Sequence, residues 1–81
     1  MKLTYDQRYN IAYLRFHESN VEVDTIKVSD ELNIDLTPDG TVYGIELLNA
    51  NKQLWEEDEG KLLVIDDATG KRVEIPIHST T

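Results

Sequence analysis

The sequence predicts a mainly β protein of the α+β class, built on an antiparallel sheet of about five or six strands with one short helix. Apolar and polar residues alternate with period 2 along most of the chain, which is typical of strands buried on one face. Short turn sequences separate the alternating segments, which favours sequential hairpins and an antiparallel sheet. Only residues 49–60 break the alternation over a length that suits a helix.

The first strands are expected at residues 2–5 (KLTY) and 11–17 (IAYLRFH), with the polar turn DQRYN between them. In this turn, Asp6 is expected to accept hydrogen bonds from the backbone amides that follow it, as in an Asx-turn. The second segment is partly apolar on both faces, so we expect a central strand or one covered on both sides. One face carries Ala12, Leu14 and Phe16, and the other carries Ile11, Tyr13 and Arg15.

An extended segment and two further strands are expected before the chain reaches the helix. Residues 21–29 (VEVDTIKVS) are rich in β-branched side chains and predict an extended segment with an interruption near Asp24. Residues 31–37 (ELNIDLT) and 41–48 (TVYGIELL) alternate cleanly and predict two strands. In the last of these, Tyr43, Ile45 and Leu47 are expected on one face, and Gly44 indicates a bulge or a close backbone contact.

Residues 49–60 (NANKQLWEEDEG) predict a short helix that Asn49 caps and Gly60 ends. Leu54 and Trp55 are expected to fold back on the sheet, so that the helix covers one sheet face. Residues 61–67 (KLLVIDD) and 71–78 (KRVEIPIH) flank the turn ATG and predict a final hairpin. Pro76 confines the last strand to an edge or to its own end. We summarise the expected order as four strands, a short helix and two strands.

Length and composition bound the possible functions. Eighty-one residues suit a single domain, which we place at residues 1–81. The net charge of −8 and the dispersed basic residues disfavour direct nucleic-acid binding. No apolar run approaches the roughly 18 residues of a membrane span, and no cysteine is present. We therefore expect a soluble, cytoplasmic protein without a membrane partner.

The stretch DLTPDGTVYGIE, residues 35–46, nearly matches the calcium-binding loop of helix–loop–helix proteins. Such a loop requires a helix on each side, whereas both flanks here alternate as strands. PDG is moreover a turn sequence, in which Pro38 sets φ and Gly40 supplies a positive φ. The stretch therefore predicts a hairpin and no metal site. The positions that match the calcium pattern are Asp35, Asp39, Gly40 and Glu46, and Thr37 stands where Asp or Asn belongs.

No catalytic residue, cofactor or metal site is predicted, and we expect that the protein is not an enzyme. His17 and His78 are the only histidines, and both are expected to be exposed, without the oriented partner that nucleophilic catalysis needs. Glu46 lies in an apolar strand and is expected to face solvent or to pair with Arg15 or Lys52. The alternative is a small metal-dependent protein or enzyme that uses the acidic residues around the hairpin, Asp35, Asp39 and Glu46.

Two stretches resemble a small prokaryotic family, the domain of unknown function 2283. They are YDQRYNIAYLRF and LNIDLTPDGTVYGIELLNANKQL, and the resemblance covers about residues 1–54. Members of the family read YD-x-x-x-D, then an alternating strand, a D-x-D-x-x-G turn and a GIE-(I/L)-L strand that leads into A-S. The chain departs from this pattern at Asn10, Thr37 and Asn51. The family has no established activity and its genes often lie beside those of small toxin-like proteins, so the resemblance implies an antitoxin-like or partner-binding role.

The acidic run EEDE follows Trp55 and offers a surface for a basic protein. Acidic side chains oppose the dipole at a helix C-terminus, so we expect this run to fray the helix. An aromatic anchor beside an acidic rim favours docking of a basic partner, although Trp55 also suits the core of so small a domain. A small basic, toxin-like protein is the predicted partner, and a homodimer is also expected. The predicted partner-binding residues are Trp55, Glu56, Glu57, Asp58 and Glu59.

Overall fold

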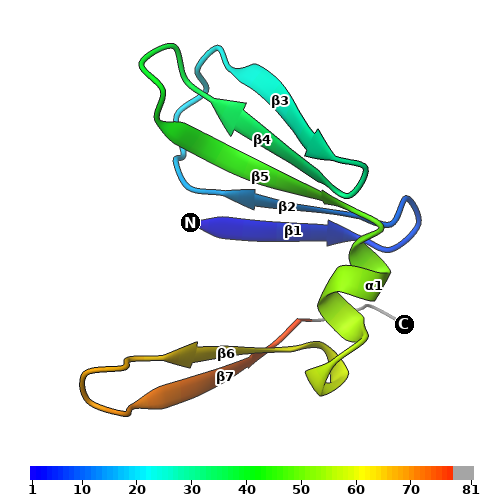
Figure 1. The fold of residues 1–81 in the computed structure, drawn as a ribbon, viewed down its shortest axis with the longest axis vertical. Coiled ribbons are helices and arrows are strands. Elements are labelled where there is room, and N and C mark those ends of the chain that lie inside the picture. Colours follow the sequence, from blue (N-terminus) through cyan, green and yellow to red (C-terminus); the bar gives the residue numbers. More distant parts are fainter. Residues whose placement is uncertain (78–81) are drawn as a thin grey trace.

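The computed structural model describes residues 1–77, with the side chain of Asp58 excepted. Its first strands are β1 (Lys2–Asp6), β2 (Ile11–Arg15), β3 (Asp24–Ser29), β4 (Leu32–Leu36) and β5 (Val42–Leu48). Helix α1 (Ala50–Trp55), the 3₁₀ turn η1 (Asp58–Gly60) and strands β6 (Lys61–Ile65) and β7 (Arg72–Pro76) follow (Figure 1). The predicted fold class is confirmed, because the chain is mainly β with an antiparallel sheet and one short helix. The expected order is wrong in one respect: five strands, not four, precede the helix.

Strands β1 to β5 form one antiparallel sheet in the order β1-β2-β5-β4-β3. The register places Leu14 of β2 and Ile34 of β4 on either side of Ile45. Leu3 of β1 lies opposite Leu14, and Ile26 of β3 lies opposite Ile34. One apolar row therefore crosses all five strands on a single side, because opposed residues share a face. We call this side the apolar face; it also carries the neighbouring row of Tyr5, Ala12, Leu47 and Leu32.

Gly44 of β5 lies beneath the side chain of Tyr13 on the opposite, polar face. The Tyr13 hydroxyl reaches past Gly44 and donates to Asp35 Oδ2 on β4 (2.6 Å). A Cβ atom at position 44 would lie 2.3 Å from the Tyr13 hydroxyl oxygen, which confirms the predicted close contact at this glycine. Burial raises the pKa of the Tyr13 hydroxyl above its ordinary value, and the hydrogen bond to Asp35 raises it further.

A bulge beside Gly44 changes the direction of Tyr43. The register between β4 and β5 shifts after Asp35, so that Tyr43 has no partner residue on β4. Tyr43 is buried and lines a shallow hollow together with Tyr13 and Arg15, which belong to the polar face. The expectation that Tyr43 shares a face with Ile45 is therefore wrong, because the bulge interrupts the alternation.

The two turns predicted within the five-stranded sheet are confirmed. Between β4 and β5, the Gly40 amide donates to the Thr37 carbonyl (2.9 Å), and Gly40 has a φ of 87°. Asp39 accepts hydrogen bonds from the Thr37 hydroxyl and from the backbone amide two residues further on, and these bonds lower the pKa of the Asp39 carboxyl. Between β1 and β2, Asp6 Oδ1 accepts from the Arg8 amide (2.9 Å), as an Asx-turn requires. The calcium-like stretch is thus a hairpin with a strand on each side.

The start of α1 is capped by a residue that lies far away in the sequence. Asn10, at the end of the β1–β2 turn, has a φ of 59°, and its side-chain oxygen accepts from the Asn51 amide. The Asn10 carbonyl also accepts from the Ala50 amide (3.0 Å). The expected cap by Asn49 is wrong, because Asn49 makes no side-chain hydrogen bond to the helix amides. Asn10 therefore performs the capping that was expected of Asn49.

The turn between β3 and β4 is also bonded to the start of α1. The carbonyl of Glu31 accepts from the Leu48 amide (3.0 Å) and from Gln53 Nε2 (3.0 Å). The Glu31 carboxylate accepts from Asn49 Nδ2 (2.9 Å). Two turns of the sheet therefore fix the position and direction of α1.

Strands β6 and β7 form a separate two-stranded sheet, which lies apart from the five-stranded sheet and is joined to it through α1 and η1 (Figure 1). The helix ends at Trp55, before the acidic run, and is therefore shorter than the expected range 49–60. Trp55 packs on Gly60, where an added Cβ would lie 2.6 Å from the ring. Pro76 ends β7, as predicted.

We predict that Gly44→Ala lowers the free energy of unfolding by about 1–3 kcal/mol, because the new methyl group displaces the Tyr13 ring. Urea unfolding of Gly44→Ala in the wild type and in a Tyr13→Ala background measures the coupling. In the Tyr13→Ala background the cost is expected to vanish, because the space above position 44 is then free. An equal cost in both backgrounds would contradict the packing described here.

We predict that Asn10→Ala lowers the free energy of unfolding by about 1–3 kcal/mol, because it removes a helix cap and places a Cβ residue in a left-handed conformation without side-chain compensation. Asn10→Gly keeps the backbone conformation and loses only the cap, so it is expected to cost less. Asn10→Asp keeps a capping oxygen and is expected to stay near the wild type. Thermal unfolding followed by circular dichroism ranks the three variants, and an Asp variant as unstable as Ala would disprove the capping role.

Candidate protein-interaction surface

The apolar face of the five-stranded sheet is largely open to solvent. Among the described residues, the buried apolar side chains are those of Ala12, Tyr43 and Ala50, and two of these are alanines. At the two ends of the apolar row, Leu3 is 39 % exposed and Ile26 is 48 % exposed. The side chains between them are only half-buried. The sheet therefore has an apolar side without the second layer that normally covers it.

Helix α1 covers too little of the sheet to form that layer. It has six residues, and in the sheet it packs mainly against β2. Ala12 on β2 and Ala50 on α1 are both fully buried, and the Ala50 amide donates to the carbonyl of Asn10, the residue before β2. Tyr5 on β1 adds a hydroxyl hydrogen bond to Asn51. The expected cover of one sheet face by the helix is therefore confined to one end of β1 and β2.

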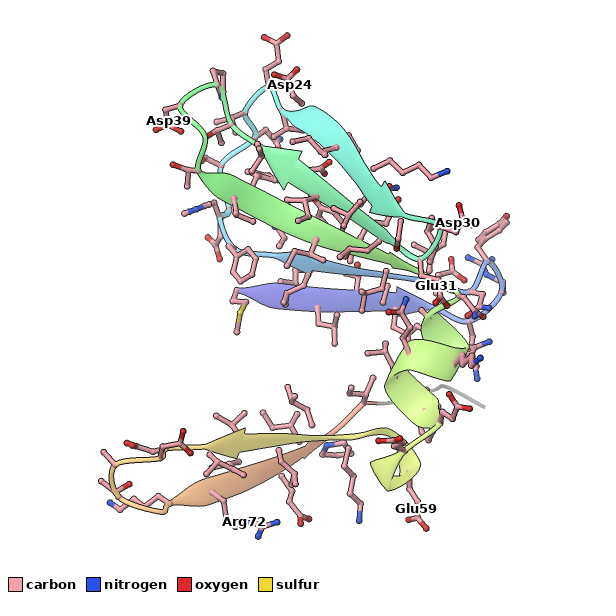
Figure 2. All side chains as sticks on the ribbon, in the orientation of Figure 1. Asp24, Asp30, Glu31, Asp39, Glu59 and Arg72 are labelled. Carbon is pink, nitrogen blue, oxygen red and sulfur yellow. The ribbon has the colours of Figure 1, made fainter. Side chains whose placement is uncertain are left out.

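The β6–β7 hairpin has an apolar face of its own. Leu62 lies opposite Ile75, and Val64 lies opposite Val73, so these four side chains share one side of the hairpin. Their exposed fractions are between 45 % and 59 %. Arg72, on the other side, points away from the five-stranded sheet in Figure 2. The apolar side of the hairpin therefore lies on the side nearer to the sheet, yet no strand of that sheet packs extensively against it.

Carboxylates surround the five-stranded sheet. Figure 2 shows Asp24 and Asp39 at one end of the sheet and Asp30 and Glu31 at the other. Among the described side chains, ion pairs join Asp6 to Arg8 (3.1 Å), Lys27 to Asp30 (3.3 Å) and Arg72 to Glu74 (3.9 Å). Most of the acidic residues therefore have no cation beside them, and the surface around the apolar face is negative.

The predicted partner-binding residues occupy the joint between α1 and the hairpin. Trp55 is half-buried against Gly60, while Glu56, Glu57 and Glu59 are exposed. The side chain of Asp58 lies outside the described part of the structure. The segment thus presents exposed carboxylates beside a tryptophan that packs within the protein.

The acidic residues of the metal alternative are engaged separately. Asp35 accepts from Tyr13 and, through its other oxygen, from the Thr25 hydroxyl (2.6 Å). Glu46 is half-buried and accepts from Asn33 Nδ2 on β4 (2.9 Å). Of its two expected environments, solvent or an ion pair with Arg15 or Lys52, the ion pair is not among those of the described side chains. Asp39 is bonded within its own turn. Within residues 1–77, the described side chains form no group of three or more potential metal ligands.

The two histidines are the remaining candidates for a catalytic or metal-binding side chain. His17 follows β2, is exposed as predicted, and lies with its ring centre 6.3 Å from that of Tyr43. His78 lies outside the described residues. Within residues 1–77, no helix is long and apolar enough to cross a membrane.

Comparison with protein families places the five-stranded sheet within a known group. The model of the family described as "Protein of unknown function (DUF2283)" matches residues 2–51. This chain belongs to that family. Comparisons with curated proteins and with solved structures gave no match. The matched part runs from β1 to the beginning of α1, so the family unit comprises the five-stranded sheet, whereas the β6–β7 hairpin lies beyond the matched residues.

The position of Asn10 now explains part of the family pattern that the chain resembles. Asp and Asn both tolerate a left-handed φ and both offer a side-chain oxygen to a helix start. An Asp at the position of Asn10 can therefore cap α1 in the same way. Thr37, the second departure, still bonds to Asp39 and preserves the turn. The departures at Asn10 and Thr37 thus keep the local structure.

We predict that millimolar calcium or magnesium leaves the melting temperature of the protein unchanged, because Asp35, Asp39 and Glu46 are engaged separately. Differential scanning fluorimetry across a metal titration measures this, since a ligand that binds the folded state raises the melting temperature. A saturable increase that Asp39→Ala abolishes would support the metal alternative instead.

Proposed function

We propose that this protein acts by binding another protein rather than by catalysis, and that its contact surface is the apolar face of the five-stranded sheet. One observation supports this most directly: an apolar row crosses all five strands, and its ends at Leu3 and Ile26 are substantially exposed. Contiguous apolar surface in water is unfavourable and commonly marks a contact site. A protein that packs on this face removes the apolar side chains from water.

The charge of the protein adds a preference for the partner. Carboxylates lie at both ends of the sheet, most of the acidic residues that the structure describes have no ion-pair partner, and the net charge is −8. Such a surface attracts a basic protein during encounter and repels acidic ones. A small basic partner is therefore favoured by charge, and the resemblance to a family whose genes often lie beside those of small toxin-like proteins adds the antitoxin-like role to the proposal. The proposal places the protein in the cytoplasm, because a chain without cysteine is compatible with a reducing compartment. Self-association into a homodimer through the same open sheet is part of the proposal.

We predict that Leu3→Asp abolishes retention of the bound protein, whereas Thr4→Asp retains it. The two residues are neighbours on β1, both are exposed, and they point to opposite sheet faces. Only Leu3→Asp places a carboxylate within the proposed contact, where desolvation weakens binding by about tenfold or more. Tagged variants are expressed in the native host, and the proteins that co-purify are quantified by mass spectrometry.

Circular dichroism establishes that both variants are folded before retention is compared. Co-purification is expected to recover one protein, an untagged copy of this chain or a basic partner, in stoichiometric amount with the wild type and with Thr4→Asp. Equal retention by Leu3→Asp and Thr4→Asp would show that the apolar face is not the contact surface.

A further inference from the structure

We infer that the apolar face is covered by a second copy of this chain, whose β6–β7 hairpin packs its apolar side on the five-stranded sheet. The contact is made twice about a two-fold axis, with each hairpin on the sheet of the other protomer. This inference rests on the proposed function, because it specifies how the homodimer that belongs to that proposal covers the same surface.

The exposed area of one chain is too large for a compact monomer and suits one half of a dimer. The accessible surface is 6283 Å². A compact protein of 9.3 kDa exposes roughly 5,000 Å², so the excess is on the order of 1,000 Å². The radius of gyration of 14.2 Å likewise exceeds the roughly 12 Å expected for 81 residues. Stable interfaces bury about 800 Å² per partner, and obligate dimers bury more. The excess therefore matches the area that a permanent homodimer removes from water.

The hairpin itself requires a surface to pack on. A two-stranded hairpin alone is at best marginally stable in water. In β6 and β7, four aliphatic side chains lie on one side and are about half-exposed, while the other side mixes charged residues such as Arg72 and Glu74 with Leu63, Ile65 and Pro76. The wholly apolar side is the one that suits packing on a second layer, as in the outer strands of a β-sandwich.

The hairpin is held away from the sheet of its own chain. Hydrogen bonds from Asn10 and Glu31 fix the start of α1, and Trp55 packs on Gly60 at its far end. The Ile77 amide donates to the Gly60 carbonyl (2.7 Å), so both ends of the hairpin are tied to this joint. Folding the hairpin onto its own sheet requires these contacts to break, whereas the sheet of a second copy can approach without breaking any of them.

Charge favours a hairpin on a sheet over two sheets face to face. Residues 61–77 carry equal numbers of basic and acidic side chains and have no net charge, so the whole net charge of −8 belongs to residues 1–60. Two sheets that face each other bring two acidic rims together, which is unfavourable. A neutral hairpin on the acidic sheet of the partner avoids this repulsion. The charged residues that decide this are Lys61, Asp66, Asp67, Lys71, Arg72 and Glu74.

The first experiment compares two hairpin variants by sedimentation equilibrium. Val64 and Ile65 are neighbours on β6 with nearly equal exposed fractions of 49 % and 51 %, but they point to opposite sides of the hairpin. The wild type is expected to be a dimer at micromolar concentration. Val64→Asp is expected to raise the dissociation constant of the dimer by about tenfold or more, and Ile65→Asp to leave it within about twofold. A monomeric wild type, or equal effects of the two variants, would overturn the inference.

The second experiment tests whether the contact is reciprocal. The sheet variants are Leu3→Asp and Ile26→Asp, and the hairpin variant is Val64→Asp. In the homodimer of any one variant, both hairpin–sheet contacts contain one substituted surface. A heterodimer of a sheet variant and the hairpin variant has one contact with both sides altered and one intact contact. Random pairing alone gives twice as much heterodimer as either homodimer, so native mass spectrometry of an equimolar mixture is expected to show heterodimer well above this twofold ratio. The inference would be overturned if neither sheet variant weakened the dimer. It would also be overturned if the sheet variants weakened the dimer but Val64→Asp did not.

The failure of this inference is distinguishable from failure of the proposed function. Suppose that the wild type is monomeric and that Leu3→Asp loses a different protein which co-purifies with the wild type. This result overturns the second copy as the occupant of the apolar face but leaves the protein-binding function in place. A dimer that depends on Val64 and on the sheet supports the inference whatever other protein is recovered.

Discussion

The attachment of α1 to two turns of the sheet determines how the rest of the chain is arranged. Asn10 ends the β1–β2 turn and caps the helix, while Glu31 in the β3–β4 turn accepts hydrogen bonds from Asn49, just before the helix, and from Gln53 within it. These contacts set the direction in which the chain leaves β5. The C-terminal hairpin therefore lies beside the sheet rather than over it, and the apolar face stays open. A few polar contacts thus decide where the largest apolar surface is exposed.

The sequence predicts those features that depend on neighbouring residues. Alternation in residues 31–37 and 41–48 predicts the two central strands, and Pro38 with Gly40 predicts the turn between them. Gly44 predicts a close contact, although only the structure shows that Tyr13 makes it. The cap by Asn10 was not predictable from local pattern, because the residue lies 41 positions before the amide that it binds. The direction of Tyr43 was missed because a bulge reverses the alternation on which the expectation rested.

The interaction surface illustrates the same limit at a larger scale. Alternation shows which side of each strand is apolar, but it does not show what covers that side. The sequence directed attention to Trp55 and the acidic run after it, because aromatic and charged residues are conspicuous in a short chain. In the structure the tryptophan packs on Gly60, and the broader apolar surface is formed by aliphatic residues of separate strands. Only strand order and register bring Leu3, Ile45 and Ile26 into one row.

The family match separates the five-stranded sheet from the β6–β7 hairpin. The matched residues contain the whole five-stranded sheet and its open apolar face, but they end within α1. In this chain the residues after the match include a hairpin with one apolar side, no net charge and no packing surface in its own protomer. In the proposed dimer, a hairpin with these properties suits the open face of the other protomer in polarity and charge, because the fixed direction of α1 holds it away from the sheet of its own chain.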